Sequence, residues 1–261
     1  MIPIPILSLE AILIILVFYA ATVGWLVWTL RIILSAKARR RLGPWRIFVY
    51  AILAAMSCLT AWYHYDLHQQ TADFKMKFEP VLSEDSFIGG IDMPAGTKLV
   101  VNAPYDFETF REAKFPYPVR ISGTDALFAE RYLRAETDEE YRTLGYTPLN
   151  IRLTGIGEGL ENEWRCDAAH PIALQTHSDG SVKAFESCMA AVGNRIENQP
   201  LPKGAESIAT DGTVYTDGFV ASDRWLIYLP ADAEVKIGNK AQIGGVIRLD
   251  AERRVITKPL R

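Results

Sequence analysis

Two cysteines and two histidines lie close together in the second half of the chain, and these residue types can bind zinc or form a disulfide. Cys166, His170, His177 and Cys188 give the spacing C-x3-H-x6-H-x10-C. Structural zinc sites use four such ligands, but this spacing matches none of the common tetrahedral patterns. An Asp-Gly pair at 179–180 predicts a hairpin turn between the cysteines. We expect Cys166 and Cys188 to form a disulfide across antiparallel strands, with zinc as the alternative.

A second cluster, H-x-D-x-H, consists of His64, Asp66 and His68. Histidines four residues apart share one face of a helix, so a metal pair is conceivable. Polar residues are also expected where a membrane helix leaves the bilayer, and this cluster directly follows an apolar run. We therefore predict no metal site there.

The usual catalytic motifs are missing from the sequence. There is no G-x-S-x-G nucleophile motif. The glycines of 155–159 are not followed by a helical pattern, as a dinucleotide site requires. The acidic run Asp138-Glu139-Glu140 is typical of a solvated face. The sequence therefore predicts a protein that is not an enzyme and has no cofactor.

Two uncharged apolar stretches lie near the N-terminus, at Ala11–Leu30 and Ile47–Tyr65. They determine where the rest of the chain lies relative to a membrane. Each has about the 20 residues that a helix needs to cross the hydrocarbon core. A cleaved signal peptide would begin with positive charges and have a shorter apolar core, so we expect the first stretch to remain as a helix. Cys58 lies within the second stretch and is expected to act as a small apolar residue. The connector between the stretches is strongly basic: Arg31, Lys37, Arg39, Arg40, Arg41 and Arg46.

Short basic loops stay in the cytoplasm, so this connector predicts a two-pass protein with both termini outside. In a Gram-negative cell that means an inner-membrane protein with N- and C-termini in the periplasm, and in a Gram-positive cell the same domain faces the exterior. The periplasm is oxidising, which favours the disulfide.

Small residues four apart allow membrane helices to pack closely. This spacing occurs in Ala20 and Gly24 and again in Ala51 and Ala55, so we expect these four to form the contact between the helices. Aromatic residues favour the membrane interfaces. They predict that Trp45 lies at the inner interface and that Trp62, Tyr63 and Tyr65 lie at the outer one.

The remainder of the chain alternates apolar and polar residues between Gly- and Asp-rich turns, which is typical of antiparallel strands. Leu149–Thr154, Ile172–Thr176 and Val246–Leu249 are examples. Residues 126–141 have helical spacing instead, with apolar side chains at 127, 128, 132 and 133. The predicted fold is a transmembrane helical hairpin (1–68), a tether (69–84) and a mainly β domain (85–261). That domain is a sandwich or a short β-repeat stack with one inserted helix.

The charge distribution limits the partners of the outer part. Residues 1–70 have six basic and two acidic residues, net +4, and the whole chain is −3, so residues 71–261 carry −7. Nucleic-acid binding needs a basic surface, so we exclude it. An acidic domain suits a basic protein partner, and the lipid bilayer is the other partner.

Between Trp164 and Val214, a cysteine pair flanking a hairpin is followed by repeated units of Pro-x-Gly, strand, Asp-Gly and strand. This sequence pattern resembles that of small β-repeat proteins of Gram-negative envelopes, including membrane-anchored immunity proteins encoded beside type VI secretion effectors. The resemblance covers about 50 of the 261 residues. It implies a periplasmic binding module that neutralises a secreted toxin, and no toxin-contacting residue can be transferred from it. The alternative function is a structural or assembly subunit of a cell-envelope complex.

Overall fold

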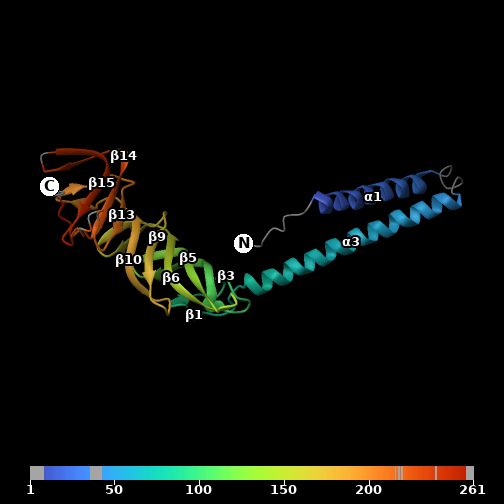
Figure 1. Ribbon diagram of the computed structural model, residues 1–261, viewed down its shortest axis with the longest axis horizontal. Coiled ribbons are helices and arrows are strands. Elements are labelled where there is room, and N and C mark those ends of the chain that lie inside the picture. Colours follow the sequence, from blue (N-terminus) through green and yellow to red (C-terminus); the bar gives the residue numbers. More distant parts are fainter. Residues whose placement is uncertain are drawn as a thin grey trace. The chain divides into compact units, whose positions relative to one another are not determined.

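The structure is a computed structural model that describes residues 9–35, 43–214, 216, 218, 220–238 and 240–256. The chain divides into two compact units, residues 1–75 and 76–261. The first contains helix α1 (Leu9–Leu34) and most of helix α3 (Pro44–Phe78) (Figure 1). Both helices are long and apolar enough to cross a membrane. The predicted tether, residues 69–84, begins as the last turns of α3, whose 35 residues span roughly 52 Å.

Hydroxyl groups, rather than the predicted small residues, hold α1 against α3. Thr22 donates to Thr60 at 3.3 Å, and Thr29 and Tyr50 share a hydrogen bond of 2.9 Å. Further along, the Tyr19 hydroxyl bonds to His64 Nε2. Polar side chains in a bilayer gain from pairing with each other, and this favours a contact that includes them.

The prediction for the small residues is therefore wrong. The buried positions of the contact are Ala21, Ser57 and Thr60. The predicted set consists of Ala20, Gly24, Ala51 and Ala55. All four are exposed and face away from the partner helix, and a methyl group added at Gly24 would meet no atom within 4 Å.

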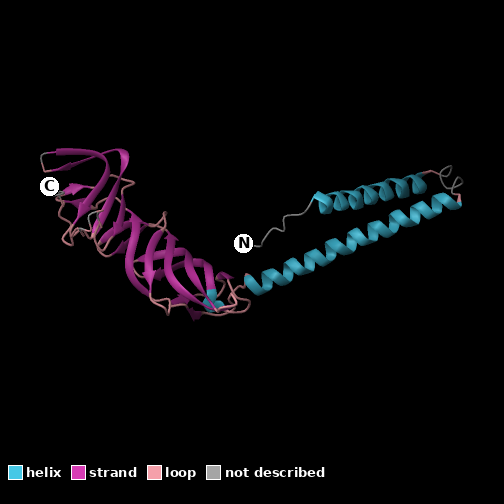
Figure 2. Ribbon diagram, in the orientation of Figure 1, coloured by secondary structure: helices cyan, strands magenta, loops and turns pink. Residues whose placement is uncertain are grey.

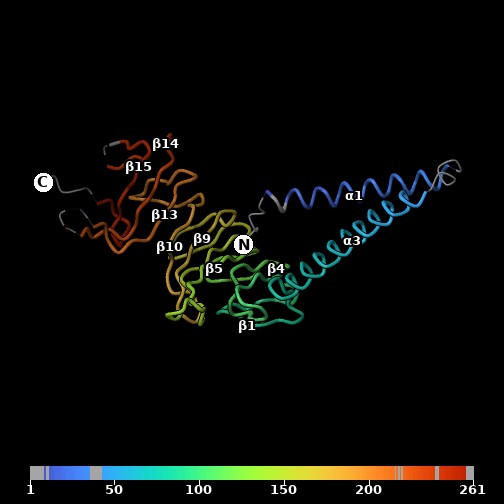
Figure 3. The backbone as a smooth tube through the Cα atoms, turned by 45° about the vertical axis from the view of Figure 1, so that its right-hand side comes forward, coloured from blue at the N-terminus to red at the C-terminus, as the bar shows by residue number. Residues whose placement is uncertain are grey.

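The second unit is built on one nine-stranded antiparallel sheet, in the order β15-β14-β13-β10-β9-β6-β5-β4-β3 (Figure 2). Strands follow one another in space almost as in sequence, so the colours of the sheet pass from green to red along it (Figure 3). The strands are β3 (Lys98–Val101), β4 (Phe110–Ile121), β5 (Thr124–Thr137), β6 (Thr143–Gly155), β9 (Ile172–Thr176), β10 (Val182–Met189), β13 (Glu206–Ala209), β14 (Trp225–Ile237) and β15 (Lys240–Leu249).

Three short hairpins lie outside this sheet, and two of them are inserted between its strands. They are β1 (Ser86–Ile88) with β2 (Ile91–Met93), β7 (Glu158–Glu161) with β8 (Trp164–Asp167), and β11 (Arg195–Ile196) with β12 (Gln199–Pro200). A single 3-10 turn, η1 (Phe107–Thr109), precedes β4. The predicted fold class, two apolar helices followed by an antiparallel β domain, is confirmed. The second layer is not a continuous sheet, as a sandwich requires, but these separate hairpins.

The sheet has one covered face and one uncovered face, as adjacent cross-strand rows show. Each residue of the inner row is at most 2 % exposed: Leu99, Ala113, Ala129, Leu153, Ile172, Cys188, Ser207, Ile227 and Ile247. The neighbouring outer row crosses all nine strands, and all but one of its residues are partly or fully exposed. Its members are Val100, Glu112, Glu130, Arg152, Ala173, Ser187, Ile208, Leu226 and Arg248, of which Ala173 is buried.

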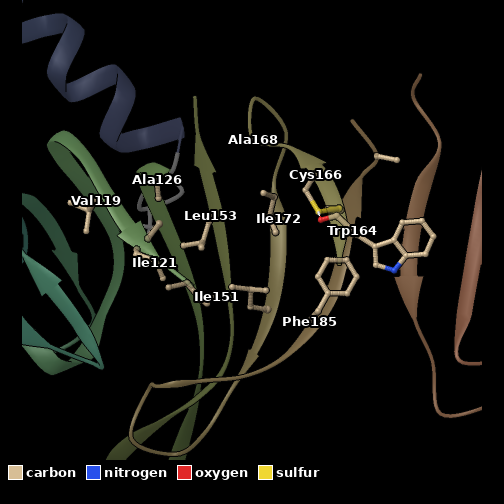
Figure 4. Packing of buried hydrophobic residues seen from close by; sticks show 14 of the residues in the cluster. Val119, Ile121, Ala126, Ile151, Leu153, Trp164, Cys166, Ala168, Ile172 and Phe185 are labelled. Carbon is tan, nitrogen blue, oxygen red and sulfur yellow. Dashed lines mark hydrogen bonds between the residues drawn. A yellow bond between two sulfur atoms is a disulfide. The ribbon is translucent and has the colours of Figure 1, made fainter. Parts of the chain in front are cut away.

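The core fills the space between the inner row and the hairpins. Trp164 of β8 is fully buried, and its ring meets that of Trp225 edge-on at 5.5 Å between centroids. The predicted disulfide between Cys166 and Cys188 is present and joins β8 to β10 (Figure 4). The bond therefore fastens a covering hairpin directly to the sheet beneath it.

The predicted helix at 126–141 is wrong, because these residues form most of β5 and the turn after it. A bulge between Ala126 and Phe128 shifts the strand's phase, so the apolar residues lose their period of two. The buried positions are taken by small residues and by Arg131, whose guanidinium lies 4.3 Å over the Phe110 ring. Pairing with β4 and β6 on either side outweighs the local helical pattern.

Two glycines of β6 provide a matched test of this packing. A Cβ at Gly155 would lie 1.9 Å from the backbone oxygen of Asp125, whereas one at Gly145 would meet nothing within 4 Å. We expect Gly155→Ala to lower the free energy of unfolding by about 1–3 kcal/mol, because strand β5 must move away. Gly145→Ala should leave it unchanged or raise it slightly. Denaturant titration of both variants measures the difference, and equal stabilities would contradict the close β5–β6 approach.

Candidate functional site

The second unit contains an open, mostly polar cleft of about 780 Å³. One wall is the start of β10, residues 182–185, and the other is the segment that follows β13, residues 209–211. The turn between β7 and β8, the start of β14 and Arg253 complete the lining. A recess of this volume is in the range of ligand-binding sites.

The cleft exists because two neighbouring strands separate. Strand β13 pairs with only the last three residues of β10, from Ser187 to Met189. It then leaves β10 and stays with β14, where the Thr210 N–H donates to the Arg224 carbonyl at 2.9 Å. Residues 182–186 of β10 consequently have a partner strand, β9, on one side only among the described residues.

Aromatic rings form the apolar part of the cleft. Phe185 and Trp225 are each 7 % exposed, and their ring centroids are 5.9 Å apart. Trp225 also contacts Trp164, so the cleft lies directly on the core and on the disulfide-bonded hairpin. A side chain entering here would pack on a rigid surface.

Arg253 closes one end of the cleft. Its guanidinium lies 4.2 Å over the Trp164 ring, and one nitrogen donates to the Asn162 carbonyl at 3.0 Å. Desolvation lowers the pKa of Arg253, although Glu163, 3.5 Å away, acts in the opposite direction. The arginine joins the C-terminal segment to the β7–β8 turn.

The turn that presents Arg253 occurs twice in the domain. In Asp250-Ala251-Glu252-Arg253-Arg254, the Arg254 backbone and side chain both donate to the Asp250 carboxylate at 2.8 Å. Desolvation tends to raise the pKa of Asp250, but these hydrogen bonds hold it below its ordinary value. The fourth residue, Arg253, has the left-handed φ of 61°.

The second copy of this turn, residues 138–142, lies at the tip of the β5–β6 hairpin. The Arg142 backbone N–H and side chain both bond to Asp138 and lower its pKa. Its left-handed residue is Tyr141, with φ 60°, and this side chain is 88 % exposed. The acidic run predicted to be a helix face is therefore a rigid turn that displays an aromatic ring.

A buried carboxylate fixes the same, turn end of the β7–β8 hairpin. Glu161 is 4 % exposed and accepts hydrogen bonds from Ser122 Oγ at 2.6 Å, the Gly123 N–H at 2.7 Å and Thr124 Oγ1 at 3.0 Å. All three donors come from the turn between β4 and β5. Glu161 lines the cleft, but these donors already engage both of its carboxylate oxygens.

The uncovered face carries an ordered polar surface. Arg152 donates to the Tyr132 hydroxyl at 2.8 Å, and its guanidinium lies 4.7 Å over that ring. Asn150 of β6 donates to Glu186 of β10 at 3.3 Å, across the intervening strand β9. Long side chains held in this way lose less entropy on binding than free ones.

The structure separates the remaining predicted residues. Both cysteine sulfurs of the zinc alternative are bonded to each other, His170 lies 4.0 Å from Asp167, and His177 is at the β9–β10 turn. Among the described residues, no group of three or more His, Cys, Asp and Glu is placed to hold a metal. The glycines of 155–159 lead from β6 into β7 rather than into a helix.

The predicted membrane residues lie on the two helices or outside the described residues. Arg31 is in the last turn of α1 and Arg46 in the first turn of α3. Four exposed aromatic residues lie along α3: Trp45, Trp62, Tyr63 and Tyr65. The other basic residues of the connector lie outside the described residues: Lys37, Arg39, Arg40 and Arg41.

The cleft is not predicted from the sequence. The sequence feature that relates to it is the motif D-x-E-x-R, which occurs at 138–142 and 250–254, because its second copy forms the turn that carries Arg253. Comparisons with protein-family models, with curated proteins and with solved structures find no match to this chain.

Proposed function

We propose that this chain is a membrane-anchored binding module whose β unit holds a protein partner. The observation that carries the proposal is the uncovered face of the nine-stranded sheet, whose outer row crosses every strand with side chains that, apart from Ala173, are partly or fully exposed. A sheet that buries only one face offers a broad, rigid surface on the other. Rigid surfaces bind at a lower entropic cost.

The proposed cellular location of the module follows from its charges and its disulfide. Arg31 and Arg46 mark the ends of the basic connector, which the positive-inside rule keeps in the cytoplasm, so the β unit is on the exported side. A disulfide between two buried cysteines is typical of an oxidising compartment such as the periplasm. In a Gram-negative cell the anchor is then in the inner membrane.

The proposed partner is a basic protein, because residues 71–261 have a net charge of −7. The finer form of the proposal is an immunity protein that occludes a secreted toxin. It is supported by the resemblance of residues 164–214 and by the one-sided sheet, since a toxin can be blocked by surface complementarity alone. Binding of this kind requires no catalytic residues in the module.

Site-specific photo-crosslinking in whole cells tests the proposal. A photoreactive phenylalanine at Tyr132, on the uncovered face, should form one discrete adduct with a basic protein. The same group at Val192, an exposed loop position, is the control. Cells that express the chain should also survive competition with the strain that delivers the toxin. An absence of any adduct at Tyr132, together with no protection, would overturn the proposal.

One observation favours the alternative, an assembly subunit of an envelope complex. Ala20, Gly24, Ala51 and Ala55 face away from the α1–α3 contact, where a neighbouring helix could approach closely. Under this alternative, Gly24→Leu should release membrane subunits that co-purify with the chain in detergent at fixed stoichiometry. Under the binding-module proposal, Gly24→Leu leaves the Tyr132 adduct unchanged.

A further inference from the structure

We infer that the cleft between β10 and β13 takes an extended segment of the protein partner as an added strand along β10. The inference rests on the proposed function and assigns a site to it. The first support is the interrupted pairing, since β13 covers β10 only from Ser187 onward. A strand edge without a partner presents backbone donors and acceptors to an incoming chain.

The hydrogen-bond pattern shows which backbone groups face the cleft. The His177 N–H donates to the Ser181 carbonyl at 2.8 Å, so this is a hydrogen-bonded pair of the β9–β10 ladder. Such pairs alternate with non-hydrogen-bonded ones. The next pair, Thr176 with Val182, is therefore non-hydrogen-bonded, and the N–H and C=O of Val182 point away from β9.

Two residues from Thr176 along β9, the alternation again gives a non-hydrogen-bonded pair. Leu174 pairs with Phe185 in the non-hydrogen-bonded manner, so the backbone groups of Phe185 also point away from β9. Val182 and Phe185 both line the cleft. The cleft thus receives backbone donors and acceptors from one strand, which is the chemistry that recognises an extended peptide.

The side-chain environment of the cleft defines the segment further. The rings of Phe185 and Trp225 offer an apolar surface for one side chain of the incoming strand. The charged side chains of the lining balance one another, with Glu161, Glu163 and Asp211 against Lys183, Arg224 and Arg253. The apolar rings and the backbone groups, rather than a net charge, therefore define the segment.

Synthetic peptides test the inference on the full chain in lipid nanodiscs. The probe is a fluorescent, end-blocked peptide of about ten residues that alternates valine and threonine. Its anisotropy should rise on binding, and the amide exchange of Val182 and Phe185 should slow. A peptide with proline at alternate positions cannot form the ladder and should not bind.

A matched pair of variants locates the site. Val182→Trp fills the cleft from a side chain that is 37 % exposed, and Val246→Trp adds the same bulk on the uncovered face, at 41 % exposure. We expect Val182→Trp to weaken peptide binding at least about tenfold and Val246→Trp to leave it unchanged. Both variants should keep the unfolding midpoint of the parent chain.

Equal binding by the parent and Val182→Trp, or no binding of the alternating peptide at millimolar concentration, would overturn the inference. The photo-crosslinking experiment separates this failure from that of the proposed function. A partner captured equally by the parent and by Val182→Trp overturns strand addition and leaves the binding module in place. Loss of the Tyr132 adduct in Val182→Trp alone supports strand addition.

Discussion

Replacing Trp164 with alanine is expected to lower the free energy of unfolding of the β unit by about 3–5 kcal/mol, the usual cost of removing a fully buried tryptophan. Trp164 is 0 % exposed, its ring contacts Trp225, and the guanidinium of Arg253 lies over it. The variant therefore loses the contact between the β7–β8 hairpin, the sheet and the C-terminal turn at once.

Denaturant titration of the full chain in detergent, followed by the circular dichroism of the sheet, measures this effect. Leu160→Ala is the matched control, because Leu160 belongs to the same hairpin but is 59 % exposed. It should cost less than about 0.5 kcal/mol. If Trp164→Ala were as mild as Leu160→Ala, the hairpin would not be part of the core.

The double variant Cys166→Ala/Cys188→Ala is expected to lose about 3 kcal/mol of unfolding free energy. The disulfide closes a loop with a sequence separation of 22 residues, and the chain-entropy relation for that length gives this value. Both cysteines are at most 1 % exposed, so reduction without unfolding should be slow.

Two measurements check the second prediction. Cys58→Ala, which removes the free cysteine, should leave the unfolding midpoint of the β unit unchanged. A thiol-specific reagent should label one cysteine in the denatured, non-reduced chain and three after reduction. Three labelled cysteines before reduction would contradict both the bond and the exported location that we propose.

Much of the architecture can be predicted from the sequence where one physical cause dominates. Uninterrupted apolar runs mark α1 and α3, and strict alternation of apolar and polar residues marks Leu149–Thr154 of β6. The cysteine pair was identified because an Asp-Gly turn lies between its members. Each of these signals is local, so no knowledge of neighbouring elements is required.

The failures have a common cause, since they depend on contacts between distant elements. The β5 prediction failed because a bulge shifts the strand's phase and its buried positions hold alanines and Arg131. The helix-contact prediction failed because Thr22 and Thr60 select the contact face across 38 residues. The cleft could not be predicted, because it arises where β13 leaves β10 for β14, and no residue pattern encodes that divergence.

The strand order has a consequence for how the domain forms. Six of the eight adjacencies in the sheet join consecutive strands, and the other two skip only a short hairpin. Such a meander has a low contact order, and low contact order favours rapid folding. If the β unit is exported as we propose, a chain emerging from a translocon can therefore add strands vectorially, from β3 to β15, without waiting for its C-terminus.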